Sequence, residues 1–165
     1  MKIELQLINC FLFILPLLVW NLVLGPRISQ EKITSDTHSP KWLLIAENLS
    51  RLLVFAFPLL LPLQVKHGWN KAGLAVYSLG TLIYFASWLP LLLSPDSRWS
   101  HRTAGLLAPR LTPFLSFLGI SLVGSSWLYA GISILFIFLH TLHGIQNLGP
   151  EKETGSLQLN HQSSR

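Results

Sequence analysis

The stretch from Trp42 to Gln64 decides the fold, and it reads WLLIAENLSRLLVFAFPLLLPLQ. It is apolar, and it has the length that a helix needs to cross the roughly 30 Å hydrocarbon core of a bilayer. Glu47 and Arg51 lie one helical turn apart near its start and can pair with each other. Charged groups at membrane depth need protein or water as partners. We therefore expect this helix to lie at the centre of a membrane bundle.

Two prolines lie in the second half of this stretch. If all of it is helical, Pro58 and Pro62 lie on the same face as Glu47. Proline has no amide hydrogen, so the carbonyls four residues earlier, at Val54 and Pro58, lose their helical donors. The sequence predicts a kinked helix whose free carbonyls need partners from neighbouring helices.

The whole chain of 165 residues has the composition of a membrane protein. Half of its residues are hydrophobic and only 12% are charged. The apolar residues form blocks about 20 residues long, which is the length of a transmembrane helix. We predict an all-α integral membrane helical bundle that forms one domain over residues 1–148, followed by a disordered polar tail over residues 149–165. The single cysteine, Cys10, excludes an intramolecular disulfide.

About five transmembrane helices are predicted, at residues 5–25, 42–65, 72–93, 106–123 and 126–145. The last two share the apolar run from Leu111 to Gly144, whose 34 residues as one helix would be about 51 Å long and too long for one span. Thr112-Pro113 and Gly124-Ser125-Ser126 inside this run are typical of helix boundaries. A re-entrant hairpin in the same run, which would leave four spans, is the competing interpretation.

The third predicted span carries a stripe of small side chains. The stripe recurs every seven residues, at Gly73, Gly80, Ser87 and Ser94. Small residues let two helices approach closely, so we predict that this stripe packs against another helix.

Short connections and single asparagines add local predictions. The connection at residues 66–71 is short, which predicts that the second and third spans are antiparallel neighbours, with Asn70 as the N-cap of the third. Asn21, near the end of the first span, is predicted to form a hydrogen bond between helices or to lie at the membrane interface.

The basic residues predict an orientation. With five spans, one side of the membrane holds eight Lys and Arg residues and the other holds three; with four spans the split is six against five. The positive-inside rule therefore favours five spans, with the N-terminus outside and the C-terminus in the cytoplasm of a cell whose plasma membrane holds the protein. The net charge of +5 is then explained by loops that face lipid headgroups, so no nucleic-acid partner is predicted.

Five polar residues inside the spans are candidates for a site: Glu47, Asn48, Arg51, His140 and His143. In the fifth span, a small-residue face continues along the helix to His140, and His143 follows one turn later. Both histidines and the Glu47–Arg51 pair are expected near the cytoplasmic surface. We predict that Glu47, Arg51 and His140 share one polar site.

Neither a metal nor a cofactor is predicted. Two histidines three residues apart and a carboxylate are suitable ligands for a transition metal. However, such a pair without a third ligand nearby in sequence is usually structural or interfacial. In the basic loop at residues 95–110, we expect four residues to lie among the lipid headgroups, where an anionic-lipid or phosphate site is the weaker interpretation: Arg98, Trp99, His101 and Arg102.

The sequence contains no P-loop, nucleophile elbow, HExxH, CxxC or dinucleotide fingerprint. We therefore expect a non-enzymatic bundle that acts as a partner, an accessory subunit or a small-solute carrier. Its expected partners are the lipid bilayer and another membrane protein or a second copy of the chain. The alternative is a membrane-embedded enzyme that uses Glu47, His140 and His143 on a lipid-soluble substrate.

Overall fold

The computed structural model describes residues 9–29, 40–65, 67–95 and 97–147. Its helices are η1 (Cys10–Phe13), α1 (Ile14–Ser29), α2 (Lys41–Ala56), η2 (Phe57–Leu60), α3 (Gly68–Leu93), α4 (Arg98–His101), α5 (Thr103–Leu111), α6 (Pro113–Val123) and α7 (Trp127–Asn147). These residues contain no strand, only an isolated bridge between Asn9 and Pro62. The predicted all-α class is confirmed. The start of the first predicted span, at residues 5–8, and the predicted tail lie outside the described residues.

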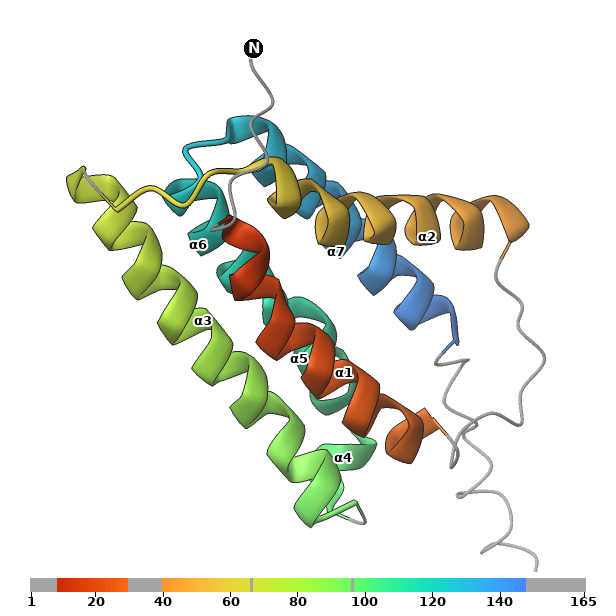
Figure 1. Ribbon diagram of the computed structural model, residues 1–165. Helices are drawn as coiled ribbons and strands as arrows, with labels where there is room; N and C mark the ends of the chain where they lie inside the picture. The colour runs from red at the N-terminus through yellow and green to blue at the C-terminus, as the bar shows by residue number, and fades with distance from the viewer. Residues whose placement is uncertain (1–8, 30–39, 66, 96, 148–165) are drawn as a thin grey trace, which may run out of the picture.

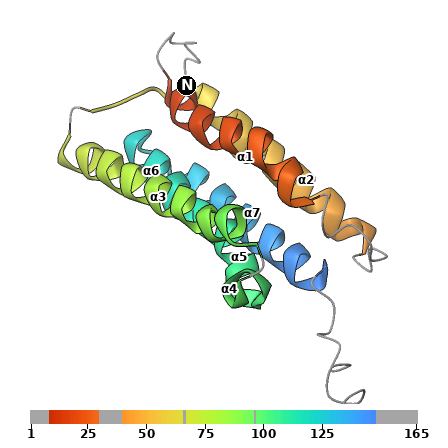
Figure 2. The same cartoon turned by 90° about the horizontal axis from the view of Figure 1, so that it is seen from below.

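The helices form two layers, as Figures 1 and 2 show. One layer contains α1 and α2, and the other contains α3, α5, α6 and α7. The most extensive helix contact joins α3 to α6, while α2 packs on α7 and α1 contacts α3. The chain near residue 9, the α2–α3 connection and the α6–α7 turn lie at one end of the molecule. The ends of α1, α3 and α7 lie on the far side (Figure 1).

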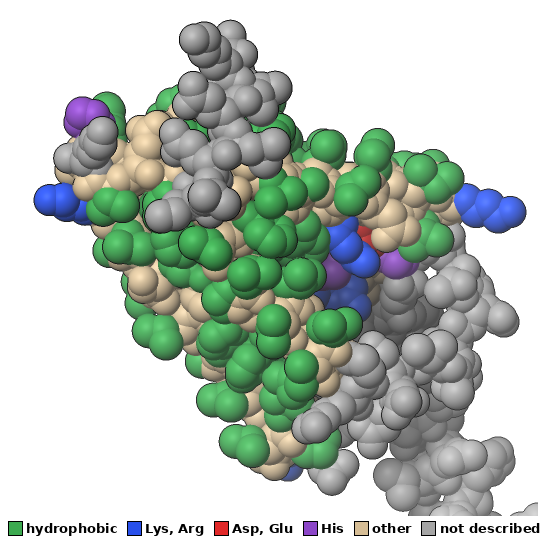
Figure 3. All heavy atoms as spheres, in the orientation of Figure 1, with side chains coloured by type: hydrophobic (Ala, Val, Ile, Leu, Met, Phe, Trp, Pro, Cys, Tyr) green, Lys and Arg blue, Asp and Glu red, His purple; other side chains and the backbone are tan. Residues whose placement is uncertain are grey.

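Four helices are long and apolar enough to cross a membrane. They are Lys41–Leu60, Gly68–Leu93, Thr103–Val123 and Trp127–Gln146, and Cys10–Gly25 is a shorter apolar helix. Their outer faces expose large aliphatic side chains, and Figure 3 shows such side chains over much of one face. Ile45, Leu52 and Leu82 are each about two-thirds exposed, which suits a lipid environment. The chain is a polytopic membrane protein.

The second predicted span is not helical to its end. The α-helix ends at Ala56, and one 3-10 turn at Phe57–Leu60 leads into extended chain. The prediction of one kinked helix over residues 42–65 is therefore wrong. Two prolines four residues apart remove successive helical hydrogen bonds, so the helix stops at Pro58 instead of bending there. Pro62 lies in the extended connection.

The carbonyl that Pro58 frees does find a partner in another helix. The Tyr129 hydroxyl of α7 donates to the Val54 carbonyl at 3.2 Å. Val54 and Tyr129 are both fully buried. The predicted need for a donor from a neighbouring helix is confirmed at this position.

The extended connection after Leu60 also changes which helices are neighbours. A residue of extended chain spans about 3.3 Å, so the connection can reach across the bundle. Consequently α3 packs on α6 and α2 packs on α7. The prediction that the second and third spans pack as neighbours is wrong.

The small-residue stripe of α3 faces α6 as predicted at Gly73, Gly80 and Ser87, whereas Ser94 lies beyond the end of α3 and is exposed. A methyl group at Gly80 would lie 2.6 Å from the amide nitrogen of Ser116, and one at Gly73 would lie 2.7 Å from Cβ of Leu122. Farther along the stripe, the hydroxyl of Ser87 lies 3.1 Å from that of Thr112. The two backbones approach so closely that only small residues fit between them.

Asn70 joins the start of α3 to the end of α6. It is not the N-cap: His67 is, and Asn70 accepts from the His67 amide at 3.2 Å. Its side-chain nitrogen donates to the carbonyls of Leu122 and Val123 at 2.9 and 3.1 Å, and to the Ser125 hydroxyl at 3.0 Å. The last turn of α6 thereby gains a side-chain donor for the Val123 carbonyl and a further donor for the Leu122 carbonyl, which also accepts from the Ser125 amide.

Asn21 of α1 forms the predicted bond between helices. It accepts from the Tyr84 hydroxyl of α3 at 2.7 Å. The two layers are thus joined by a polar contact as well as by apolar packing.

The long apolar run divides where one of the two predicted boundaries lies. Ser125 has a left-handed φ of 51° in the turn after α6, and the Ser126 hydroxyl accepts from the Tyr129 amide as α7 begins. Thr112, in contrast, keeps helical dihedrals, so α5 and α6 continue each other through Pro113. The helix begins at Thr103, and the predicted loop at residues 95–110 is therefore largely helical.

Candidate functional site

The packing of α2 on α7 places the polar candidates. Leu43, Glu47, Ser50 and Val54 form the buried face of α2, at the spacing of one helical stripe. Glu47 is 1% exposed. A buried carboxylate requires hydrogen bonds and opposite charge, because transfer from water to a low-dielectric environment is costly.

Three side chains supply those contacts to Glu47. Arg51, one turn along α2, pairs with Oε1 through Nη2. From α7, Nδ1 of His140 lies 2.8 Å from the same oxygen, and His143 contacts Oε2 through Nδ1. The structure thus brings together four of the five polar residues chosen from the sequence. Their functional role stays a prediction.

Asn48 is the fifth candidate, and it lies elsewhere. It is exposed, on a different face of α2 from Glu47. The reason is geometric, since consecutive helical residues point about 100° apart, at 3.6 residues per turn.

Arg110 of α5 is a member of the cluster that the sequence analysis missed. Its guanidinium lies against Gly144 of α7, where an added methyl group would overlap it. It is close enough to interact electrostatically with Glu47, Arg51 and His140. Arg110 lies where the predicted basic loop at residues 95–110 overlaps the predicted span at residues 106–123, and the structure places it in a helix that contacts α7. The Glu47 cluster is defined here as Glu47, Arg51, Arg110, His140 and His143.

The Glu47 cluster is partly open to its surroundings. The side chains of Arg51, His140 and His143 are 44%, 26% and 17% exposed. On its inner side, Phe136 stacks on the His140 ring with 5.3 Å between centroids. Figure 3 shows basic, acidic and histidine side chains gathered in a hollow beneath α2.

The contacts decide what the carboxylate can do. A carboxylate has about four lone-pair positions, and three donors already occupy Glu47. Both imidazoles direct Nδ1 at its oxygens. Within the residues that the structure describes, no group of three His, Cys, Asp or Glu side chains is arranged to hold a metal ion. The arrangement favours an ion-pair network that joins α2 and α7.

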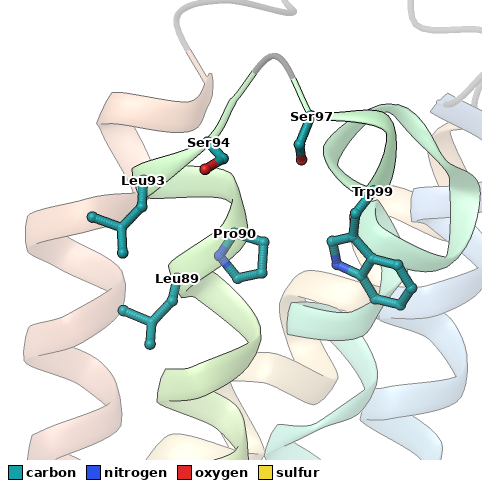
Figure 4. A pocket seen from close by; sticks show the side chains of 6 residues that line it. All are labelled: Leu89, Pro90, Leu93, Ser94, Ser97 and Trp99. Atoms are coloured by element: carbon teal, nitrogen blue, oxygen red, sulfur yellow. The ribbon is translucent and has the colours of Figure 1, made fainter.

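The expected headgroup residues lie at another place, around the short helix α4. Arg98, Trp99 and Arg102 are exposed, and the side chain of His101 is not described. Trp99 borders a shallow apolar recess whose lining consists of Leu89, Pro90, Leu93, Ser94, Ser97 and Trp99. Figure 4 shows the Trp99 ring across this recess from Pro90. A contact of these residues with headgroups stays a prediction.

Comparison of the chain with known protein families, with curated proteins and with solved structures finds no match.

Proposed function

We propose that this polytopic membrane protein is a non-enzymatic bundle that acts as an accessory subunit for another membrane protein or for a second copy of itself. The observation that carries the proposal is that the Glu47 carboxylate is buried and engaged by neighbouring side chains. Its carboxylate is 1% exposed and is occupied by donors from α2 and α7. Such a carboxylate links two helices and offers little capacity as a general base.

Exposed apolar side chains support an accessory role. The recess beside Trp99 is shallow and open, which suits a surface contact better than enclosure of a solute. The alternative, an enzyme acting on a lipid-soluble substrate, is favoured by the mutual contact of Glu47 with His140 and His143.

The test of the accessory role is the mass of the protein isolated from its own membrane in mild detergent, with the bound lipids identified. We expect a particle that contains more than one 18.5 kDa chain after subtraction of detergent. A single chain with no partner would contradict the proposal. Lipid products that accumulate with the wild type, and not with Glu47→Gln, would favour the enzyme.

We further propose five crossings of the plasma membrane, with the N-terminus outside and the C-terminus in the cytoplasm. The alternating ends of the helices and the charge split support this orientation. Cysteine labelling of the full chain tests it, because the one native cysteine, Cys10, is buried and can be replaced by alanine. In that background, Lys71→Cys should react with an impermeant maleimide from outside, and a cysteine added after Arg165 should not. Labelling of both from one side would favour four crossings.

A further inference from the structure

The Glu47 cluster carries more positive than negative charge. Glu47 is the only acidic residue in the part of the chain that the structure describes. Arg51 and Arg110 each carry one positive charge at any physiological pH. The cluster is therefore cationic even with both histidines neutral, and an uncompensated charge beside a membrane interior is costly.

Three members of the cluster contact the single carboxylate. Arg51, His140 and His143 contact its two oxygens. Among the described residues, no ion pair involves Arg110, although its guanidinium lies against Gly144 in the same cluster. A guanidinium presents five N–H donors. Arg110 can therefore bind an anion from outside this part of the chain.

The position of the cluster suits an anion at the membrane surface. Glu47 lies six residues after Lys41, where α2 begins, and His143 lies four residues before Asn147, where α7 ends. At 1.5 Å per residue these are roughly 9 Å and 6 Å from the helix ends. The layer between water and hydrocarbon has a similar thickness. Figure 3 shows basic and histidine side chains at the surface of the molecule beneath α2.

We propose that the Glu47 cluster binds a phosphoryl group, with Arg110 and the outer donors of Arg51 as its ligands. The planar fork of a guanidinium matches two phosphoryl oxygens. A bound phosphoryl group places negative charge beside both arginines, which the single carboxylate of the cluster does not neutralise. Gly144 is what leaves room for the Arg110 guanidinium. The inference rests on the proposed membrane insertion, which brings lipid phosphates to this depth. Two sources share this chemistry: a phospholipid headgroup and free phosphate.

The test is a titration of the full-length chain in detergent, read as the shift of its thermal unfolding temperature. The two probes are dihexanoyl phosphatidylglycerol and inorganic phosphate. We expect the short-chain lipid to stabilise the wild type and Arg110→Gln to weaken its apparent Kd at least tenfold. Lys71→Gln is the control, because it also removes one exposed positive charge but lies at the start of α3, away from the Glu47 cluster and from α4; its Kd should change less than twofold.

A second variant tests the geometry without removing a charge. Gly144→Ala places a methyl group where the Arg110 guanidinium lies, so it should weaken binding as Arg110→Gln does. If Arg110→Gln does not fold, the titration of Gly144→Ala still tests the site. Equally tight binding of inorganic phosphate would identify free phosphate as the ligand and support the site.

Two results would overturn the phosphoryl site: equal weakening by Lys71→Gln and Arg110→Gln, which indicates diffuse attraction, or no stabilisation of the wild type by either probe. The labelling and mass experiments measure insertion and assembly separately. Failure of the titration alone would therefore leave the proposed function in place.

Discussion

Nδ1 of His140 lies 2.8 Å from Oε1 of Glu47, although the two residues are 93 positions apart in the sequence. This contact crosses from α7 in one layer to α2 in the other. Lipid offers no hydrophobic driving force for helix association, so polar contacts and close packing must hold the layers together. The predictions below test these contacts one at a time.

The ion pair of Glu47 and Arg51 should be energetically coupled. Arg51→Leu leaves a buried carboxylate without its ion-pair partner on α2, whereas the Glu47→Gln, Arg51→Leu double variant removes both charges of the pair. Because Arg51 is 44% exposed, solvent weakens the pair. We expect the double variant to be more stable than the sum of the single effects by about 1 kcal/mol. Thermal unfolding in detergent measures this difference.

The control cycle for that pair combines Glu47→Gln with Lys41→Leu. Lys41 is exposed at the start of α2, so these two effects should add. Strict additivity for Glu47 and Arg51 as well would mean that the two charges act independently.

Gly80→Leu should disrupt the contact of α3 with α6. Its side chain would meet the backbone of Ser116, where even a methyl group would lie 2.6 Å from the amide nitrogen. Overpacking typically costs about 1–3 kcal/mol, and a rigid backbone neighbour favours the upper end of that range. Leu82→Phe, on the exposed face of α3, should leave the unfolding temperature nearly unchanged. If both variants are equally stable, α6 does not cover the stripe.

Tyr129→Phe should destabilise the protein because it removes the donor to the Val54 carbonyl. A buried carbonyl without a partner costs about 1–3 kcal/mol. The stacking of the ring on Phe57, with 6.0 Å between centroids, can remain. Unfolding temperatures of the two proteins measure the loss.

Pro58→Ala provides the matched background for the Tyr129 variant. Alanine restores an amide hydrogen four residues after Val54, so Tyr129→Phe should cost less there than in the wild type. An equal cost in both backgrounds would show that the proline does not create the need for Tyr129.

Asn70→Ala should cost about 1–3 kcal/mol, since it leaves the buried carbonyl of Val123 at the end of α6 without the Asn70 donor, whereas the Leu122 carbonyl keeps the Ser125 amide. Asn48→Ala is the matched control, because Asn48 is exposed. Its effect should stay within about 0.5 kcal/mol. A comparable loss of stability in the two variants would contradict the assignment of Asn70 as the link between α3 and α6.

Several features of the fold could be predicted because they depend on spacing along one helix. The lengths of the apolar blocks indicated an all-α membrane bundle, and four helices have the length and apolar composition to cross a membrane. The stripe at Gly73 and Gly80 indicated a close helix contact, and both glycines do pack closely against α6. Glu47 and Arg51 form a pair within one turn, as their spacing predicts. The span predicted at residues 42–65 is present as Lys41–Leu60, but its end was placed too late because the prolines were interpreted as a kink.

The sequence by itself determined which faces of the helices are buried, because helical periodicity groups side chains along the same chain segment. Only the tertiary structure decided what covers each face. It placed α7 against α2, and it brought Arg110 of α5 to Gly144 of α7. These contacts between helices depend on the distance that the extended chain after Leu60 can span and on how closely the helix backbones can approach. Neither quantity is a property of a single helix.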